Sequence, residues 1–157
     1  MTPSGALHGY AVMEIAASLR EHARTTGRGV AFGDNVGFIV NLPDRRSFSP
    51  DAAFWTGGPL VEGFLEGAPV FAVEVRSEED FGLVAERRLA AKRRDYFAAG
   101  TLVVWDVDPI DALVVRAYRA SDPDRPTIYR RGEVADASPA VPGWTLPVDA
   151  LFPQDRL

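Results

Sequence analysis

The segment at residues 70–75 constrains the fold most, because it is a nearly continuous apolar run rich in β-branched and aromatic residues. Such a run is typical of a strand that is buried on both faces of a sheet. One carboxylate, Glu74, interrupts it. A charge in the middle of a buried strand is rare unless it is paired or bound to a metal. Glu74 is therefore the first candidate functional residue.

A helix is predicted after this strand, from the acidic residues 78–80 to about Ala99, and it carries the only lysine of the chain, Lys92. With about 100° per residue and Phe81 set at 0°, Lys92 falls at about 20°, inside the apolar stripe of the helix. An ammonium group there costs several kcal/mol unless a carboxylate meets it. Glu74 is the nearest candidate partner in sequence, and Asp51 is the second.

A second buried strand is predicted at residues 101–107. Strand, helix and strand with a crossover of this length predict a parallel pair in a right-handed unit. The remaining pattern predicts a helix at 8–24, a hairpin of 29–32 with 36–40, a polar loop at 41–50, a short strand after Asp51, and strands at 112–118 and 127–129. The Pro-rich C-terminal part is expected to pack Trp144, Leu151 and Phe152 against the body.

The composition excludes several classes of protein. Its 157 residues and 46% apolar content suit one domain, residues 1–157, with a core at about 4–152. No run approaches roughly 18 apolar residues, and the N-terminus lacks the pattern of a signal peptide. The absence of cysteine removes disulfides and cysteine metal sites and favours the cytoplasm. The net charge of −5 argues against a strongly basic nucleic-acid binder, but it is compatible with an enzyme that holds DNA through local arginines and a metal.

The first helix offers three further candidates. His8 and His22 are the only histidines, and no third ligand accompanies them, so an N-terminal and a solvent-facing histidine are expected. Glu14 is either an auxiliary metal ligand or a solvated helix residue, and the second interpretation is favoured. Acyl chemistry through Ser49 or Ser77 is not favoured, because both histidines lie in this helix rather than near either serine.

Two carboxylates and one lysine can form the site of a divalent-metal hydrolase. Asp51 and Glu74 offer hard oxygen ligands for Mg²⁺, which keeps several of its waters. A bound metal lowers the pKa of a water and stabilises charge on a phosphate. Lys92 can hold or deprotonate the attacking water, or offset the phosphate charge.

The ordered segments SPDAAF, FAVEVRS, KRRDYFAAG and VVWDVDP resemble the Uma-two family of restriction endonucleases within the PD-(D/E)XK nuclease superfamily. The matching positions are Pro50-Asp51, Glu74-Val75-Arg76-Ser77, Lys92, Tyr96, Gly100 and Trp105-Asp106-Val107-Asp108-Pro109. The opening SGALHG also looks like the segment that enters the first helix of the family. The resemblance covers roughly residues 4 to 152, and the ordered set is specific although each piece alone is weak.

The resemblance implies an α/β (α+β) restriction-endonuclease-like fold, with a mixed sheet flanked by helices and the strand–helix–strand crossover at 70–107. It implies a DNA endonuclease that uses Mg²⁺ or Mn²⁺, with Asp51 and Glu74 as metal ligands and Lys92 as the catalytic lysine. A homodimer is expected, since symmetric nucleases cut both strands as pairs.

Two departures from the pattern stand out. The superfamily lysine lies two residues after the strand carboxylate, where this chain has Arg76, so Lys92 represents a lysine that has migrated to the helix. Family members also commonly have a strand pair ahead of the first helix, whereas this sequence begins almost at the helix. Either that strand pair is dispensable, or the start is truncated and the loss of an acidic ligand would weaken activity.

Two other interpretations stay open. In the first, the chain is a nuclease-like module that binds without cutting. In the second, Glu74 and Lys92 form only a buried structural ion pair. Convergence of Asp51, Glu74 and Lys92 within about 4–6 Å would favour catalysis. The arginines of the long helix either touch a phosphate backbone or form its solvated face, and the solvated face is favoured because acidic residues are interspersed: Arg87, Arg88, Arg93 and Arg94.

Overall fold

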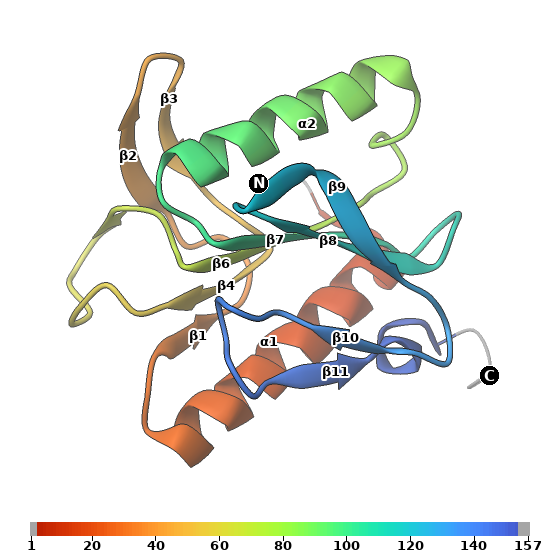
Figure 1. Cartoon of the computed structure of the whole chain (residues 1–157), viewed down its shortest axis with the longest axis horizontal. Helices are drawn as coiled ribbons and strands as arrows, with labels where there is room; N and C mark the ends of the chain where they lie inside the picture. Colours follow the sequence, from red (N-terminus) through yellow and green to blue (C-terminus); the bar gives the residue numbers. More distant parts are fainter. Residues whose placement is uncertain (1–2, 154–157) are drawn as a thin grey trace.

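The computed structural model describes residues 3–153. Within them, a six-stranded mixed sheet lies between two α-helices, α1 (Ala6–Thr26) and α2 (Leu83–Ala98), which cover its opposite faces (Figure 1). The strand order is β1-β4-β6-β7-β8-β9. The bounds of these strands are β1 Val30–Phe32, β4 Ala52–Trp55, β6 Phe71–Val75, β7 Val103–Asp108, β8 Val114–Arg119 and β9 Asp122–Tyr129.

The central strands β6 and β7 run parallel, with Glu74 opposite Asp106, and α2 forms the crossover between them. This confirms the strand–helix–strand unit predicted from the sequence. Successive side chains of a strand point to opposite faces. Phe71, Val73 and Val75 belong to the core on the α1 side, so Glu74 faces α2.

The main core lies between the sheet and α1. Ala11, Ile15 and Leu19 are fully buried along one face of α1, and they belong to the same cluster as Val73 and Trp105 of the sheet. The C-terminal segment completes this core through β10 (Val134–Asp136), β11 (Thr145–Pro147) and the 3₁₀ helix η1 (Val148–Leu151). The predicted packing of this segment is confirmed, because these side chains are at most 3% exposed: Trp144, Leu151 and Phe152.

A smaller core lies on the α2 side of the sheet. Tyr96 of α2 is fully buried and belongs to one cluster with Ala72 and Val104 of the sheet. Its ring stacks on Phe48, with the centroids 3.9 Å apart and the planes at 13°. This contact holds the C-terminal half of α2 against the sheet and fixes the height of Lys92, one turn earlier.

The predicted hairpin of residues 29–32 with 36–40 is wrong. β1 pairs instead with β4, with Val30 opposite Trp55, and β2 (Phe38–Leu42) enters a three-stranded sheet with β3 and β5 (Leu65–Glu66). Gly29 explains part of this choice, because a Cβ there would lie 2.3 Å from the ring of Phe54 on β4. Local pattern located the strands correctly, but a distant partner in the sequence set their pairing.

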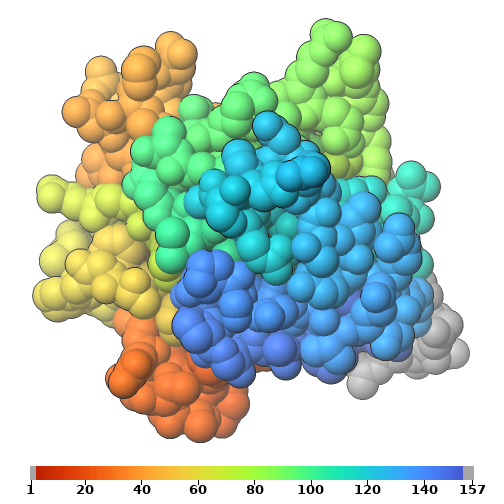
Figure 2. Space-filling view, in the orientation of Figure 1, coloured from red at the N-terminus to blue at the C-terminus, as the bar shows by residue number. Residues whose placement is uncertain are grey.

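The predicted loop at 41–50 is also wrong, because β3 (Arg45–Phe48) forms within it. Leu42 pairs with Arg45 across a two-residue turn at Pro43 and Asp44. Two parts project from the body (Figure 2). One is the N-terminal end of α2, and the other is the β2–β3 hairpin, which lies near the opposite end of that helix. The polar, half-exposed character of β3 concealed it from a reading based on apolar runs.

The second helix begins at Leu83, later than the acidic residues 78–80 predicted. Asp80 does not cap the helix, because its Oδ2 accepts the backbone N–H of Ser77 at 2.8 Å and the Ser77 hydroxyl at 3.0 Å. Gly82, with φ of 96°, then sets the chain in a conformation that interrupts helical geometry. Asp80 thus stabilises a local turn before the helix.

Candidate functional site

Glu74 and Lys92 form an ion pair between β6 and α2. Lys92 Nζ contacts Oε1 of Glu74, and the two side chains are 26% and 18% exposed, respectively. The structure therefore turns Lys92 toward the sheet, as its place in the apolar stripe predicted. Its partner is Glu74, the nearer in sequence of the two carboxylates predicted to pair with it.

The hydroxyl of Tyr96 donates a hydrogen bond to the same oxygen of Glu74, at 3.1 Å. Two donors on α2 therefore hold Oε1, while Oε2 accepts no hydrogen bond within the described part of the chain. Burial raises the pKa of Glu74 above its usual range, Lys92 opposes that shift, and the nearby charge of Asp51 adds to it. A cation beside the free oxygen would favour the ionised carboxylate.

Asp51 is the residue immediately before β4, and it lies beside β6 next to Glu74. Its backbone N–H donates to the carbonyl of Val73 at 3.0 Å, and its side-chain Oδ2 accepts the N–H of Val75 at 2.7 Å. The Asp51 side chain thus continues the hydrogen bonding to β6 beyond the last backbone pair of β4 and β6. This contact fixes the carboxylate beside Glu74. Among residues 3–153, the other oxygen, Oδ1, accepts no hydrogen bond.

His8 is a part of this site that the sequence analysis missed. It is only 8% exposed, and its Nε2 lies 3.4 Å from Oδ2 of Asp51, which corrects the expectation of an N-terminal histidine without a functional partner. The interaction with Asp51 raises the pKa of His8, while burial opposes the shift. One signal was present in the sequence: His8 lies at helical spacing from Ala11 and Ile15, on the face of α1 that becomes the core.

Arg76 occupies the position of the superfamily lysine, but its guanidinium is committed elsewhere. It is 5% exposed, and its Nε and one terminal nitrogen each donate to Asp106 at 2.8 Å. The remaining N–H groups donate to Glu86 and to the carbonyl of Asp80. All five donors of an arginine are thus used, so Arg76 ties β6 to β7 and α2.

The arginines of α2 divide into two groups. Arg93 is turned inward, with its guanidinium carbon 3.9 Å from the ring centroid of Tyr118 and a terminal nitrogen 3.7 Å from Asp106. This corrects the prediction that Arg93 lies on a solvated face, because aromatic and acidic partners on the sheet attract it. The other three are exposed as predicted, Arg87, Arg88 and Arg94, although Arg88 also pairs with Asp80 at 2.8 Å.

Asp51, Glu74 and Lys92 line one cavity of about 220 Å³, together with His8 and Arg88. Its wall comes from the end of β6, the residue before β4 and one side of α2. The three residues proposed from the sequence thus meet in space. Glu14 is not among the residues of this wall, so the structure does not bring it to the site.

The donor set of this cavity fits a hard divalent cation that keeps most of its waters. In each of Asp51 and Glu74, one carboxylate oxygen accepts a hydrogen bond from the protein, and the other accepts none within residues 3–153. Both residues line the same cavity. Among residues 3–153 no group of three histidine or acidic side chains is arranged to hold a metal ion. Any ion here would rest on two carboxylates and water, which is the usual coordination of Mg²⁺.

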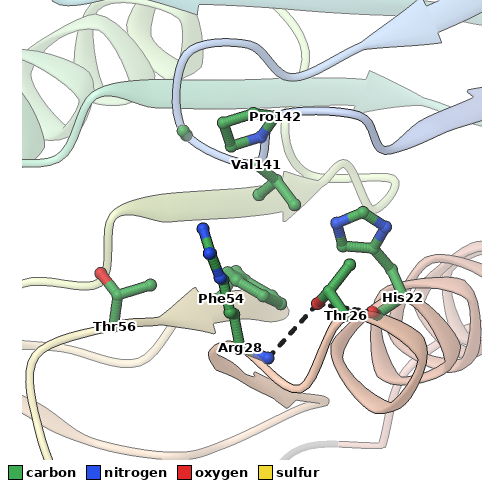
Figure 3. A pocket seen from close by; sticks show the side chains of 8 residues that line it. His22, Thr26, Arg28, Phe54, Thr56, Val141 and Pro142 are labelled. Carbon is green, nitrogen blue, oxygen red and sulfur yellow. Dashed lines mark hydrogen bonds between the residues drawn. The ribbon is translucent and has the colours of Figure 1, made fainter.

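A second cavity of about 450 Å³ lies at the other end of α1 (Figure 3). His22 and Thr26 of α1, Phe54 of β4 and Pro142 of the C-terminal segment line it, with Arg28 alongside. His22, which was predicted to face solvent, is half-buried there, and its ring lies 6.4 Å from that of Phe54. No carboxylate lines this cavity, so it does not offer the oxygen ligands found in the first.

Comparison with known proteins bears on the class of the chain. The model of the Uma2 family, described as putative restriction endonuclease, matches residues 1–149. The chain belongs to this family. A search of curated proteins found no match.

A solved structure has a similar fold. A putative nuclease belonging to DUF820 from Anabaena variabilis is similar to this chain, with a TM-score of 0.75 and 18% sequence identity. The similarity covers 97% of this chain and 83% of the other. The similarity confirms the restriction-endonuclease-like fold that was predicted for this chain. No helix among its described residues is long and apolar enough to cross a membrane.

Proposed function

We propose that this chain is a Mg²⁺- or Mn²⁺-dependent DNA endonuclease that hydrolyses phosphodiester bonds. One observation carries the proposal: Asp51, Glu74 and Lys92 line the same cavity, and each carboxylate keeps one oxygen that accepts no hydrogen bond from residues 3–153. The nuclease class comes from the family description, while the metal, the DNA substrate and the residue roles are our inference.

Asp51 and Glu74 would hold the ion through Oδ1 and Oε2, the two oxygens that accept no hydrogen bond from the described residues. The protein contacts to Oδ2 and Oε1 fix both carboxylates before any ligand arrives, so little reorganisation is needed on binding. The ion, when bound, supplies a water of lowered pKa and stabilises charge on the phosphate.

Lys92 would orient the attacking water or neutralise the phosphate. Its Nζ is a point charge with three donors, of which the contact to Glu74 engages one. The other donors are available on the cavity side, since Lys92 lines the cavity and is 26% exposed. General acid–base or electrostatic assistance of this kind contributes about 10²- to 10⁴-fold to a rate.

The second candidate is a nuclease-like module that binds without cutting. It is supported by Arg76, because the position of the superfamily lysine carries a guanidinium whose donors all serve the protein. Catalysis must then depend on Lys92 alone. The homodimer implied by the resemblance remains a prediction.

Plasmid cleavage tests the proposal. The wild type is expected to nick or linearise supercoiled plasmid in Mg²⁺ or Mn²⁺ and to stop when the metal is chelated. Asp51→Asn, Glu74→Gln and Lys92→Met should lose this activity while keeping their secondary structure. Glu62→Gln, at an exposed acidic position away from the cavity, is the matched control and should cut normally. A folded wild type that cuts with neither metal would instead favour the binding module.

A further inference from the structure

The described residues contain one buried polar side chain at the site to which neither the sequence pattern nor the proposed chemistry gives a role, namely His8. It lies in the first turns of α1, where the N–H of Gly9 donates to the carbonyl of Gly5 at 3.0 Å. Because the same helix face carries Ala11 and Ile15 into the core, the backbone of His8 is anchored from the far side of the sheet.

The imidazole has one polar contact within residues 3–153. Nε2 lies 3.4 Å from Oδ2 of Asp51, while Nδ1 is buried and has no hydrogen-bond partner. A buried polar atom without a partner costs free energy, so the placement of this ring is not explained by its own hydrogen bonding. The contact with Asp51 therefore accounts for a histidine at this position.

Oδ2 of Asp51 thereby receives two neighbours from different elements. The N–H of Val75 approaches it from β6 and His8 approaches it from α1. The terminal torsion of an aspartate is broad, so a single hydrogen bond leaves the carboxylate free to swing. Two contacts to Oδ2 restrict that swing, and Oδ1 remains as the oxygen without a hydrogen bond among the described residues.

We propose that His8 is a positioning residue that acts through Asp51 and sets the carboxylate for divalent-metal binding. This inference rests on the proposed function, in which Asp51 is a metal ligand. Side chains that contact a metal-ligating residue from outside typically change metal affinity by 10- to 100-fold when removed. His8 itself needs no contact with the ion or the substrate.

Three substitutions at this position separate positioning from simple packing. A glutamine amide reaches about as far as Nε2 of histidine, whereas an asparagine amide reaches only as far as Nδ1. His8→Gln can therefore keep a donor near Asp51, and His8→Asn places the same polar group too far away. His8→Ala removes the contact altogether.

Calorimetric titration with Mn²⁺, with thermal unfolding of each variant as a check on the fold, tests the inference. The account predicts that His8→Ala and His8→Asn bind Mn²⁺ about 10-fold or more weakly than the wild type, while His8→Gln keeps most of the affinity. Wild-type affinity in His8→Ala, or equal losses in the glutamine and asparagine variants, overturns the positioning role and leaves the proposed function intact. A wild type that binds no Mn²⁺ overturns both.

Discussion

Tyr96 donates its hydroxyl hydrogen to Glu74 across the interface between α2 and β6, at 3.1 Å. The same ring is fully buried and stacks on Phe48, so the phenol serves the core and the site at once. Burial raises the pKa of Tyr96 well above its usual value, and the adjacent charge of Glu74 adds to that shift, so the phenol remains a donor at neutral pH.

Tyr96→Phe keeps the stacked ring and removes only the hydroxyl. We expect the free energy of unfolding to fall by about 1 kcal/mol, the net value of one hydrogen bond. Tyr96→Ala should cost about 3 kcal/mol or more, because it also empties a packed site. Urea unfolding of both variants measures the difference, and equal losses would show that the hydroxyl matters as much as the ring.

Arg76 cannot supply the lysine of the superfamily pattern, because its place in the sheet directs the side chain at Asp106 and Glu86. Arg76→Lys is expected to lose the two-point contact with Asp106 and to be less stable by about 2 kcal/mol, within the range for hydrogen bonds to charged groups. The double variant Arg76→Lys with Lys92→Met should cut no better than Lys92→Met alone in the plasmid assay. Recovery of cleavage would mean that position 76 reaches the reacting phosphate.

The pH dependence of stability should include a contribution from Glu86. The Arg76 guanidinium lowers the pKa of Glu86 below its ordinary 4.5, so this contribution is present above that value and is lost as the pH falls through the folded-state pKa. Because the side chain is 48% exposed, the effect is at most about 1 kcal/mol.

Urea midpoints at about pH 6 and about pH 3 give the acid-dependent part of the stability. Glu86→Gln should reduce the difference between the two values. An unchanged difference would indicate that Glu86 carries no folded-state shift. Glu62→Gln, exposed and away from this network, is the control.

Lys92→Met separates the lysine from the metal ligands. Cleavage should fall by about 10²-fold or more, because the substitution removes an assisting charge. Metal affinity should be retained or rise, because the ammonium no longer competes with a cation for the charge of Glu74. Arg94→Met, an exposed cation on the same helix, should alter neither quantity. Loss of metal binding in Lys92→Met would contradict the role of Lys92 as an assisting charge that is separate from the metal ligands.

The parts of this site that follow from local pattern were predictable. Glu74 interrupts a buried run, and Lys92 falls inside the stripe of its helix, so their meeting required only the crossover between two strands. The pairing of β1 with β4 was not predictable, because it depends on a partner beyond the intervening β2 and β3. His8 was missed for a similar reason: its contact with Asp51 joins α1 to the start of β4, two segments that are far apart in the sequence.

Divalent-metal affinity in the carboxylate variants tests the central claim most directly. Titration of Mn²⁺ and Mg²⁺ into the wild type should show binding, which Asp51→Asn and Glu74→Gln should each weaken strongly and the double variant abolish. Glu62→Gln should bind as the wild type does. Wild-type affinity in the double variant, or no binding by the folded wild type, would contradict the account of this cavity as a metal-dependent nuclease site.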